Sequence, residues 1–345
     1  MCSSDLLWYK PSSASWLTAT LLDSVPGLTT TVGSLTNGVP YDFLLRAVTA
    51  TGNESPGLIL SATPANLITL NGAGNYATIT AALTASGGSG TVRVLAGTYS
   101  VNLNVPSGVT LTGASPNHTI LSAANPTVNV LSILPGAALT TISNLAITGG
   151  DVGISAPTSP LAVINVVIHH NSNNAIAAGV SLSAINCTLA HNGGNGVVSF
   201  STTVIRNVIA ASNATFGINV PAATSFVTYC NAYNNSPGND YAAGITNGTT
   251  FSIPVTFTNE AANDYTELPG AVSVDTGDPL DVFALEPTYN GGRINQGAFG
   301  NTEWAGRSPA PAGPPPKGKG GGGGCGLTGF EGVALLALLR RGCRR

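Results

Sequence analysis

Charged side chains are scarce in this sequence of 345 residues: Asp, Glu, Lys and Arg make up 8% of it, against roughly 25% in an ordinary soluble domain. Its 12 Lys and Arg residues are too few for the basic stripe that nucleic-acid phosphates require, and the formal net charge is -3. Nucleic acid is therefore excluded as a partner. Aromatic residues make up only 6%, which argues against one large globular core.

Cysteines and long apolar runs are also scarce. Five cysteines in a chain of this length do not make a disulfide scaffold, and only Cys187 and Cys230 fall in the middle of the chain. The repeat described next places these two about two coils apart, roughly 9 to 10 Å, which is too far for a disulfide. We therefore expect both thiols to be unpaired. No run of 18 apolar residues is present that would span a bilayer.

A repeat of 21 residues is what the sequence does contain. A unit of this length cannot bury its apolar face alone, so we expect the units to stack as a solenoid of about ten coils. Stacked asparagine amides hydrogen-bond along such a stack, and we expect Asn165, Asn186 and Asn207 to form a ladder of this kind. The repeated positions are Asn144, Asn165, Asn186 and Asn207; Asn171, Asn192, Asn213 and Asn234; Ile142, Val163 and Ile205; Ile147, Ile168 and Leu189; and Ile176, Val197 and Ile218.

Three further segments carry a family resemblance. Residues 72–83 look like the start of right-handed parallel β-helix proteins of the pectin-lyase-like class, in which a short helix covers the first coil, and residues 92–113 look like their first two coils. Residues 264–300 are similar to the closing segment of β-helix proteins from bacterial surfaces. The resemblance implies an all-β fold with a right-handed parallel β-helix over residues 64–306.

Residues 7–63 are predicted to form short strands. Tyr41, Phe43 and Leu45 alternate with other residues as in a half-buried strand, after a turn signal at residues 37–38. This region resembles the end of a fibronectin type III domain, with Tyr41 at the tyrosine corner. It is too short for a complete sandwich, so the resemblance implies an incomplete fibronectin type III-like β-sandwich before the β-helix.

Both ends of the chain carry unusual segments. Residues 1–6 resemble the translation of a sequencing-adapter end, so we expect them to lie outside the coding sequence and the signal peptide to be absent from this chain. Residues 307–324 form a Pro/Gly-rich linker. Residues 325–345 resemble the C-terminal sorting tags of Gram-negative surface proteins, with Cys325 and Gly326 in the sorting motif; the alternative is a solvated tail. The tag implies an exported protein at the cell surface, in the outer membrane or outside the cell, with transient membrane contact.

Carboxylates, which polysaccharide-cleaving β-helix enzymes need, are almost absent from the repeat region. Between residues 55 and 259 the only acids are Asp151 and Asp240, about four coils apart, too far to act on one bond. We therefore predict no catalytic residue and no cofactor. The predicted function is a structural stalk or a binder of polysaccharide or cell-envelope components. The alternative is a polysaccharide lyase or a glycoside hydrolase of the pectin-lyase-like class.

Five side chains are the candidates for surface chemistry. His170 and His191 occupy one column a coil apart, with His169 beside them, so the first two are expected to stack about 5 Å apart. Metal binding and proton transfer are the functional interpretations, and ordinary exposed histidine is the alternative. Tyr229 and Tyr233 lie among asparagines, as aromatic residues in sugar-binding grooves do, or else close the last coils.

A calcium site is compatible with the three-residue spacing of Asp275, Asp278 and Asp281. The alternative is a set of turns and caps, which Asp also favours.

Overall fold

The structure is a computed structural model that describes residues 2–25, 32, 39–49, 51–62, 68–74, 76–236, 239–245, 248–288 and 290–308. The turn predicted at residues 37–38, almost all of the predicted linker and the whole sorting segment with Cys325 and Gly326 lie outside these residues. Within the described ranges, no helix is long and apolar enough to cross a membrane.

Four antiparallel strands form a sheet at the N-terminal end, in the order β2-β1-β3-β4. The predicted strand after residue 40 is confirmed as β3. Residues 2–6 belong to β1 and pair with β3 from Thr49 to Arg46, although the sequence had placed them outside the fold. In the described part of residues 2–62 the strands make one sheet, and a sandwich is not confirmed. The elements are β1 (Cys2–Pro11), η1 (Trp16–Thr18), β2 (Thr20–Val25), β3 (Tyr41–Thr49) and β4 (Leu58–Ala62).

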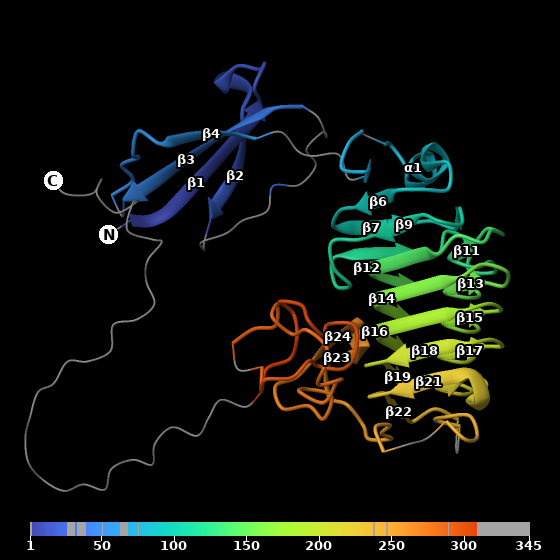
Figure 1. Ribbon diagram of the computed structural model, residues 1–345. Coiled ribbons are helices and arrows are strands. Elements are labelled where there is room, and N and C mark those ends of the chain that lie inside the picture. Colours follow the sequence, from blue (N-terminus) through green and yellow to red (C-terminus); the bar gives the residue numbers. More distant parts are fainter. Residues whose placement is uncertain are drawn as a thin grey trace, which may run out of the picture. The chain divides into compact units, whose positions relative to one another are not determined.

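A parallel β-helix of about seven turns follows, with strands stacked coil upon coil (Figure 1). Strand pairing divides it into three faces. Face 1 holds β6 (Thr91–Val94), β9 (Thr110–Thr112), β18 (Thr203–Arg206) and β21 (Ser225–Thr228); face 2 holds β7 (Gly97–Ser100), β10 (Thr119–Ser122), β19 (Ile209–Ala211) and β22 (Asn231–Tyr233). The long strands β12 (Thr140–Thr148), β14 (Leu161–His169) and β16 (Leu182–Ala190) run over both faces. Face 3 holds β8 (Leu103–Val105), β11 (Leu131–Ile133), β13 (Ile154–Ala156), β15 (Ile176–Ala178), β17 (Val197–Ser199) and β20 (Ile218–Asn219).

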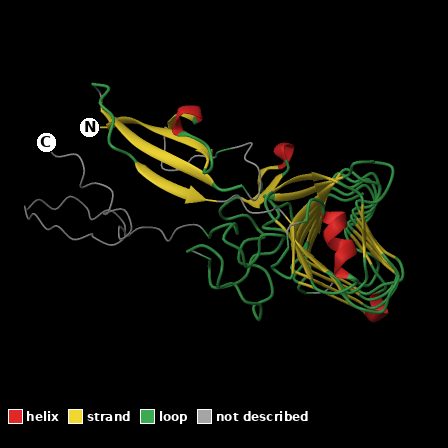
Figure 2. Cartoon of the chain, turned by 90° about the horizontal axis from the view of Figure 1, so that it is seen from above, coloured by secondary structure: helices red, strands yellow, loops and turns green. Residues whose placement is uncertain are grey.

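The two ends of the β-helix interior are closed by apolar side chains. At the start, β5 (Ile68–Leu70) pairs antiparallel with β6, and helix α1 (Ile79–Ser86) buries Ile79, Ala82 and Leu83 in the core, as the sequence predicted. The Thr78 hydroxyl caps this helix by accepting a hydrogen bond from the Ala81 N–H at 3.1 Å. Seen from above, the coils superpose around one interior with the helix over it (Figure 2). At the other end, after η2 (Ala222–Thr224), Tyr241 and Ile245 join the same core.

The predicted stacking of apolar residues is confirmed in register. Ile142 pairs with Val163, Val163 with Ala184, and Ala184 with Ile205. The columns Ile147, Ile168 and Leu189 and Ile176, Val197 and Ile218 also pair as predicted. The prediction of about ten coils is wrong: the β-helix has about seven turns, and the described residues between 255 and 308 add no further coil.

These residues form a closing segment, residues 255–306, that packs on the outside of face 2. Its elements are β23 (Phe257–Asn259), η3 (Glu260–Ala262) and β24 (Asp264–Glu267). Together with face 2 it builds a second apolar core, and this burial explains why the chain folds back instead of adding coils. The core contains Ala146, Val167, Ala190, Ile209, Ala211 and Tyr233 of the β-helix and Val255, Phe257, Tyr265, Ala271, Val274, Ala298 and Phe299 of the closing segment.

One asparagine series marks a corner of the backbone rather than an open ladder. Asn144, Asn165, Asn186 and Asn207 have φ between 50° and 55°, the left-handed region that Asn tolerates, and they bend the chain from face 1 to face 2. Asn207 Nδ2 donates to Asn186 Oδ1 at 2.9 Å, but Asn165 Nδ2 donates to the carbonyls of Ala298 and Gly300 in the closing segment. The predicted three-residue ladder is therefore wrong at Asn165.

A continuous buried ladder forms in the other series. Asn171 Nδ2 donates to Asn192 Oδ1, and Asn192 Nδ2 donates to Asn213 Oδ1, both at 3.0 Å. Asn213 Nδ2 then donates to Asn235 Oδ1, and not to Asn234 as the spacing predicted. The coil from Ser212 to Asn234 is one residue longer than the two coils before it, so Asn234 occupies the left-handed corner, with φ of 54°, and Asn235 takes the place in the ladder.

Candidate functional site

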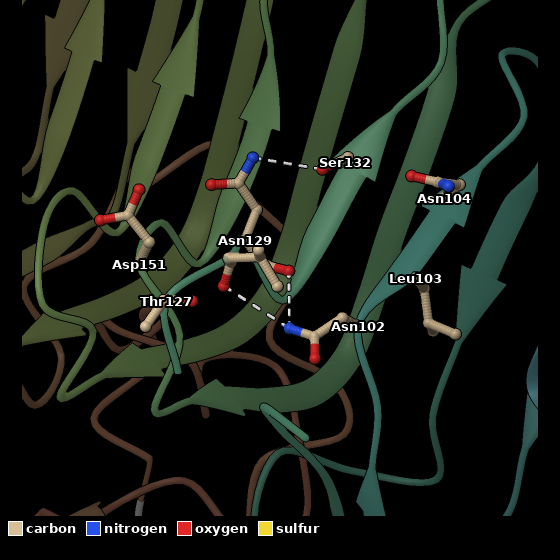
Figure 3. A pocket seen from close by; sticks show the side chains of 8 residues that line it. Asn102, Leu103, Asn104, Thr127, Asn129, Ser132 and Asp151 are labelled. Carbon is tan, nitrogen blue, oxygen red and sulfur yellow. Dashed lines mark hydrogen bonds between the residues drawn. The ribbon is translucent and has the colours of Figure 1, made fainter. Parts of the chain in front are cut away.

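The first hollow on the β-helix, the amide groove, lies beside β8 and β11 and has a volume of about 540 Å3 (Figure 3). Its lining consists of Asn102, Leu103, Asn104, Thr127, Val128, Asn129, Ser132 and Asp151. Its amides mainly hold a loop of the chain: Asn102 Nδ2 donates to the Asn129 carbonyl at 2.9 Å, and Asn102 Oδ1 accepts from the Asn125 N–H at 2.7 Å. Without an aromatic side chain in its lining, the amide groove has no flat surface on which a ligand ring would stack.

The second hollow, the aromatic groove, lies between face 2 and the closing segment and has a volume of about 500 Å3. It combines apolar walls with a few polar groups, which is the usual character of a ligand site. The β-helix contributes Pro116, Asn117, Ile120, Ala146, Thr148, Val167 and His169, and the closing segment contributes Ala262, Asn263, Asp264, Tyr265, Thr266, Phe299 and Trp304.

A partly exposed aromatic side chain, Trp304, lies at the rim of the aromatic groove. Trp304 remains 40% exposed, and its ring lies 4.8 Å from the ring of His118, with the two planes 57° apart. His118 is held in turn by the Ser115 hydroxyl, 2.7 Å from its Nδ1 atom. Tyr265 and Phe299 are almost fully buried in the second core. The indole of Trp304 is therefore partly exposed beside a hollow, where a flat ligand surface can pack against it.

Polar groups surround this ring. Asn117 comes from the turn before β10, and its Oδ1 atom accepts from the Ser115 hydroxyl at 2.6 Å, which leaves its amide N–H groups for a ligand. Asp264, at the start of β24, uses Oδ1 to accept from the N–H and the hydroxyl of Thr266. The rim thus offers amide donors and a carboxylate acceptor, the groups that bind hydroxyls.

The three predicted histidines come together as expected. The rings of His170 and His191 stack with centroids 5.3 Å apart, and His169 Nδ1 lies 2.9 Å from His170 Nδ1. His170 and His191 occupy the second left-handed corner, at φ of 51° and 54°, which explains their column. His191 Nε2 lies 3.8 Å from Glu260 Oε1 of the closing segment.

Burial disfavours the charged forms of two of these histidines, His169 and His170. For His169, burial first and then the neighbouring His170 and His191 lower the pKa to about 4. Burial and His191 also lower the pKa of His170. Over the described ranges, no group of three or more His, Cys, Asp and Glu side chains is arranged to hold a metal ion. The cluster therefore forms part of the seam between face 2 and the closing segment, where His169 also contacts Tyr265.

The two candidate tyrosines have separate surroundings. Tyr229 occupies the corner between faces 1 and 2, at φ of 52°, and its ring lies 5.1 Å from the Arg293 guanidinium. Tyr233 is buried in the second core, and its hydroxyl donates to the Val255 carbonyl at 3.4 Å. The structure does not bring these two rings to one groove.

The three candidate calcium ligands are also divided. Arg206 Nε lies 2.9 Å from Asp281 Oδ2 and 4.0 Å from Asp278 Oδ2, so one guanidinium already lies beside both carboxylates. Asp275 bonds to the hydroxyl of Ser308 and has φ of 58°, as in a turn. These contacts match the alternative of turns and caps, and the calcium site stays an untested prediction.

Two further acids have different surroundings. Asp240 Oδ1 accepts from Asn235 Nδ2 at 3.0 Å and ends the amide ladder. Glu267, at the end of β24, is buried, and burial raises its pKa to about 8. Cys187 and Cys230 are free and buried, as predicted.

The comparisons with protein-family models, with curated proteins and with solved structures found no match for this chain. Its function therefore has to be inferred from its own residues. The sequence analysis missed Trp304, His118 and Asp264 as candidates. The only signal at Trp304 was the rarity of tryptophan, since the chain has three.

Proposed function

We propose that this protein is a non-catalytic β-helix that binds polysaccharide in the aromatic groove. One observation carries the proposal: the Trp304 ring is open at the rim of a hollow that also presents Asn117 and Asp264. A pyranose ring has an apolar face that packs on indole, and its hydroxyls bond to amides and carboxylates.

Binding fits this site better than cleavage. Hydrolysis of a glycosidic bond ordinarily uses two carboxyl groups on either side of the bond. Asp264 is the only carboxylate among the described residues that line the aromatic groove, and Asp151 lies in the amide groove. A hydrolase would therefore lack its second carboxyl group in this lining.

The proposal includes the cellular setting. We place the protein at the bacterial cell surface, as a right-handed, pectin-lyase-like β-helix with an incomplete fibronectin type III-like domain (residues 7–63), a linker (307–324) and a sorting tag (325–345). Sequence resemblance supports each part. The exposed Leu58 and Leu60, on one face of β4, also support an incomplete sandwich, because the second sheet of a sandwich would cover apolar side chains of this kind.

The test is retardation of the full chain in gels that contain soluble glycans. The Trp304→Ala variant is expected to weaken binding about three- to ten-fold, because one aromatic contact is lost. Phe226→Ala is the matched control: Phe226 is 68% exposed on face 1, away from the lining of the groove, so its loss should leave binding unchanged.

Two results would contradict the proposal. Equal retardation of Trp304→Ala and the parent protein would show that the aromatic groove does not bind the glycan. Release of reducing or unsaturated sugar by the purified protein would favour the lyase or hydrolase alternative.

A further inference from the structure

The aromatic groove has a one-sided charge. Asp264 is the only ionisable acid among its described lining residues, and neither Lys nor Arg is among them. Two more carboxylates stand next to the lining in the chain, Glu260 before Ala262 and the exposed Glu303 beside Trp304. The nearest basic residue in sequence, Arg307, donates nothing to the lining and bonds through its carbonyl to the Gly270 N–H.

Two histidines of the seam, His169 and His191, do not offset this charge. His169 lines the groove but stays neutral near pH 6, because burial lowers its pKa to about 4. His191 faces Glu260 instead of the lining. A polyuronate, which carries one negative charge per sugar, would therefore meet the Asp264 carboxylate in a lining that contains neither Lys nor Arg.

The acceptor geometry at Asp264 leaves room for a cationic ligand. Both hydrogen bonds from Thr266 go to Oδ1, so a ligand can approach Oδ2. The Trp304 ring lies in the same groove, and a cation over an indole face is attracted by the π electrons. Carboxylate and indole together are complementary to an ammonium group on a sugar ring.

We infer that the aromatic groove recognises glycans that carry protonated amino groups, such as polymers of glucosamine, and excludes polyuronates. This inference rests on the proposed function, since it names the class of polysaccharide bound at the same site. It also separates this protein from β-helix enzymes that act on pectin or alginate.

Three hexasaccharides test the inference: β-1,4-linked glucosamine, its N-acetylated form, and galacturonate. Calorimetric titration of the full chain at pH 6 and low salt should show the glucosamine hexamer binding at least ten-fold more tightly than the galacturonate hexamer. It should bind about two- to five-fold more tightly than the acetylated hexamer, because acetylation replaces the charged ammonium with a neutral amide and leaves the apolar face of the sugar ring in place. Raising the salt concentration should narrow both ratios.

Variants locate the effect. Asp264→Asn keeps the Oδ1 acceptor for Thr266, so the segment should stay folded while the preference for glucosamine over its acetylated form falls about two- to five-fold. Glu303→Gln should reduce the same preference. Asp151→Asn, which removes a carboxylate from the separate amide groove, is the matched control and should leave the preference unchanged.

The outcomes distinguish the two proposals. The inference is overturned if the glucosamine hexamer binds no more tightly than the acetylated hexamer or no more tightly than the galacturonate hexamer. The proposed function survives that result if Trp304→Ala weakens the binding of a hexamer. If no hexamer binds in a Trp304-dependent way, the proposed function fails and the inference fails with it.

Discussion

Asparagine has two distinct uses in this chain, and the local backbone decides between them. At the corner between faces 1 and 2 it tolerates a positive φ, which other side chains resist. One position after the second corner, Asn171, Asn192 and Asn213 are buried and use both ends of the amide. Spacing in the sequence predicted both series, but it could not separate them, because a left-handed backbone and a hydrogen-bonded amide favour the same residue type.

The buried ladder predicts that replacing one amide nitrogen, Nδ2 of Asn192, with oxygen strongly destabilises the protein. Asn192 is 2% exposed, and its Nδ2 donates to the carbonyls of Ile168 and Ala190 as well as to Asn213. Asn192→Asp replaces this donor with an oxygen that faces three acceptors, so the free energy of unfolding should fall by about 3 kcal/mol. Chemical denaturation measures the change.

Asn104→Asp is the control, because Asn104 is exposed on β8, and it should change stability by no more than about 0.5 kcal/mol. A parent-like midpoint for Asn192→Asp would show that the ladder does not stabilise the stack.

The closing segment is the element whose stability depends most on pH, because its seam with face 2 buries both a carboxyl group and an imidazole. Glu267 has a native pKa raised to about 8 from 4.5, by burial first and then by Glu286. The native state therefore binds the proton that the unfolded state loses, and stability falls as pH rises from about 4.5 to 8. His169, with its pKa lowered to about 4, has the opposite effect: stability falls as pH drops below about 6.5. The two effects oppose each other between about pH 4.5 and 6.5, so the closing segment should be most stable in this range.

Glu267→Gln is expected to remove the alkaline part of this dependence. A neutral amide of similar size needs no proton, so at pH 8 the variant should be more stable than the parent by up to roughly 4 kcal/mol. At pH 4.5 the two should be similar. Hydrogen exchange of residues 255–306 across this pH range measures the effect locally, and a parent-like pH dependence in the variant would contradict it.

At the scale of the whole molecule, the repeat predicted the β-helix down to individual pairs such as Ile147 with Ile168. This succeeded because each coil repeats the same burial and the same corners, so local pattern and global fold agree. The aromatic groove could not be predicted, since His118 and Trp304 are 186 residues apart and meet only when the closing segment folds back. The predicted number of coils was wrong for a related reason, because composition does not distinguish a coil from a segment that packs on the outside of the coils.

Two cysteines in the interior of the β-helix can report how the coils unfold. Cys187 and Cys230 are fully buried, and burial raises the pKa of each thiol to about 12. Both should therefore resist alkylation at pH 8 in the native protein and react at one common rate as denaturant unfolds the stack. Peptide mapping by mass spectrometry measures the two rates, and earlier labelling of Cys230 would show that the last coils open independently.

The contacts of the closing segment also limit how this protein can change in length during evolution. Loss or duplication of one 21-residue unit keeps the strands of neighbouring coils in register, so such changes are tolerated where only coils touch. Asn165, Asn186 and Asn207, however, bond to the closing segment across three successive coils. His118 and Ala146 of earlier coils also contact the closing segment. The coils from His118 to Asn207 are thereby held to a fixed number, and variation in repeat number among descendants of this gene should be confined to the coils before His118.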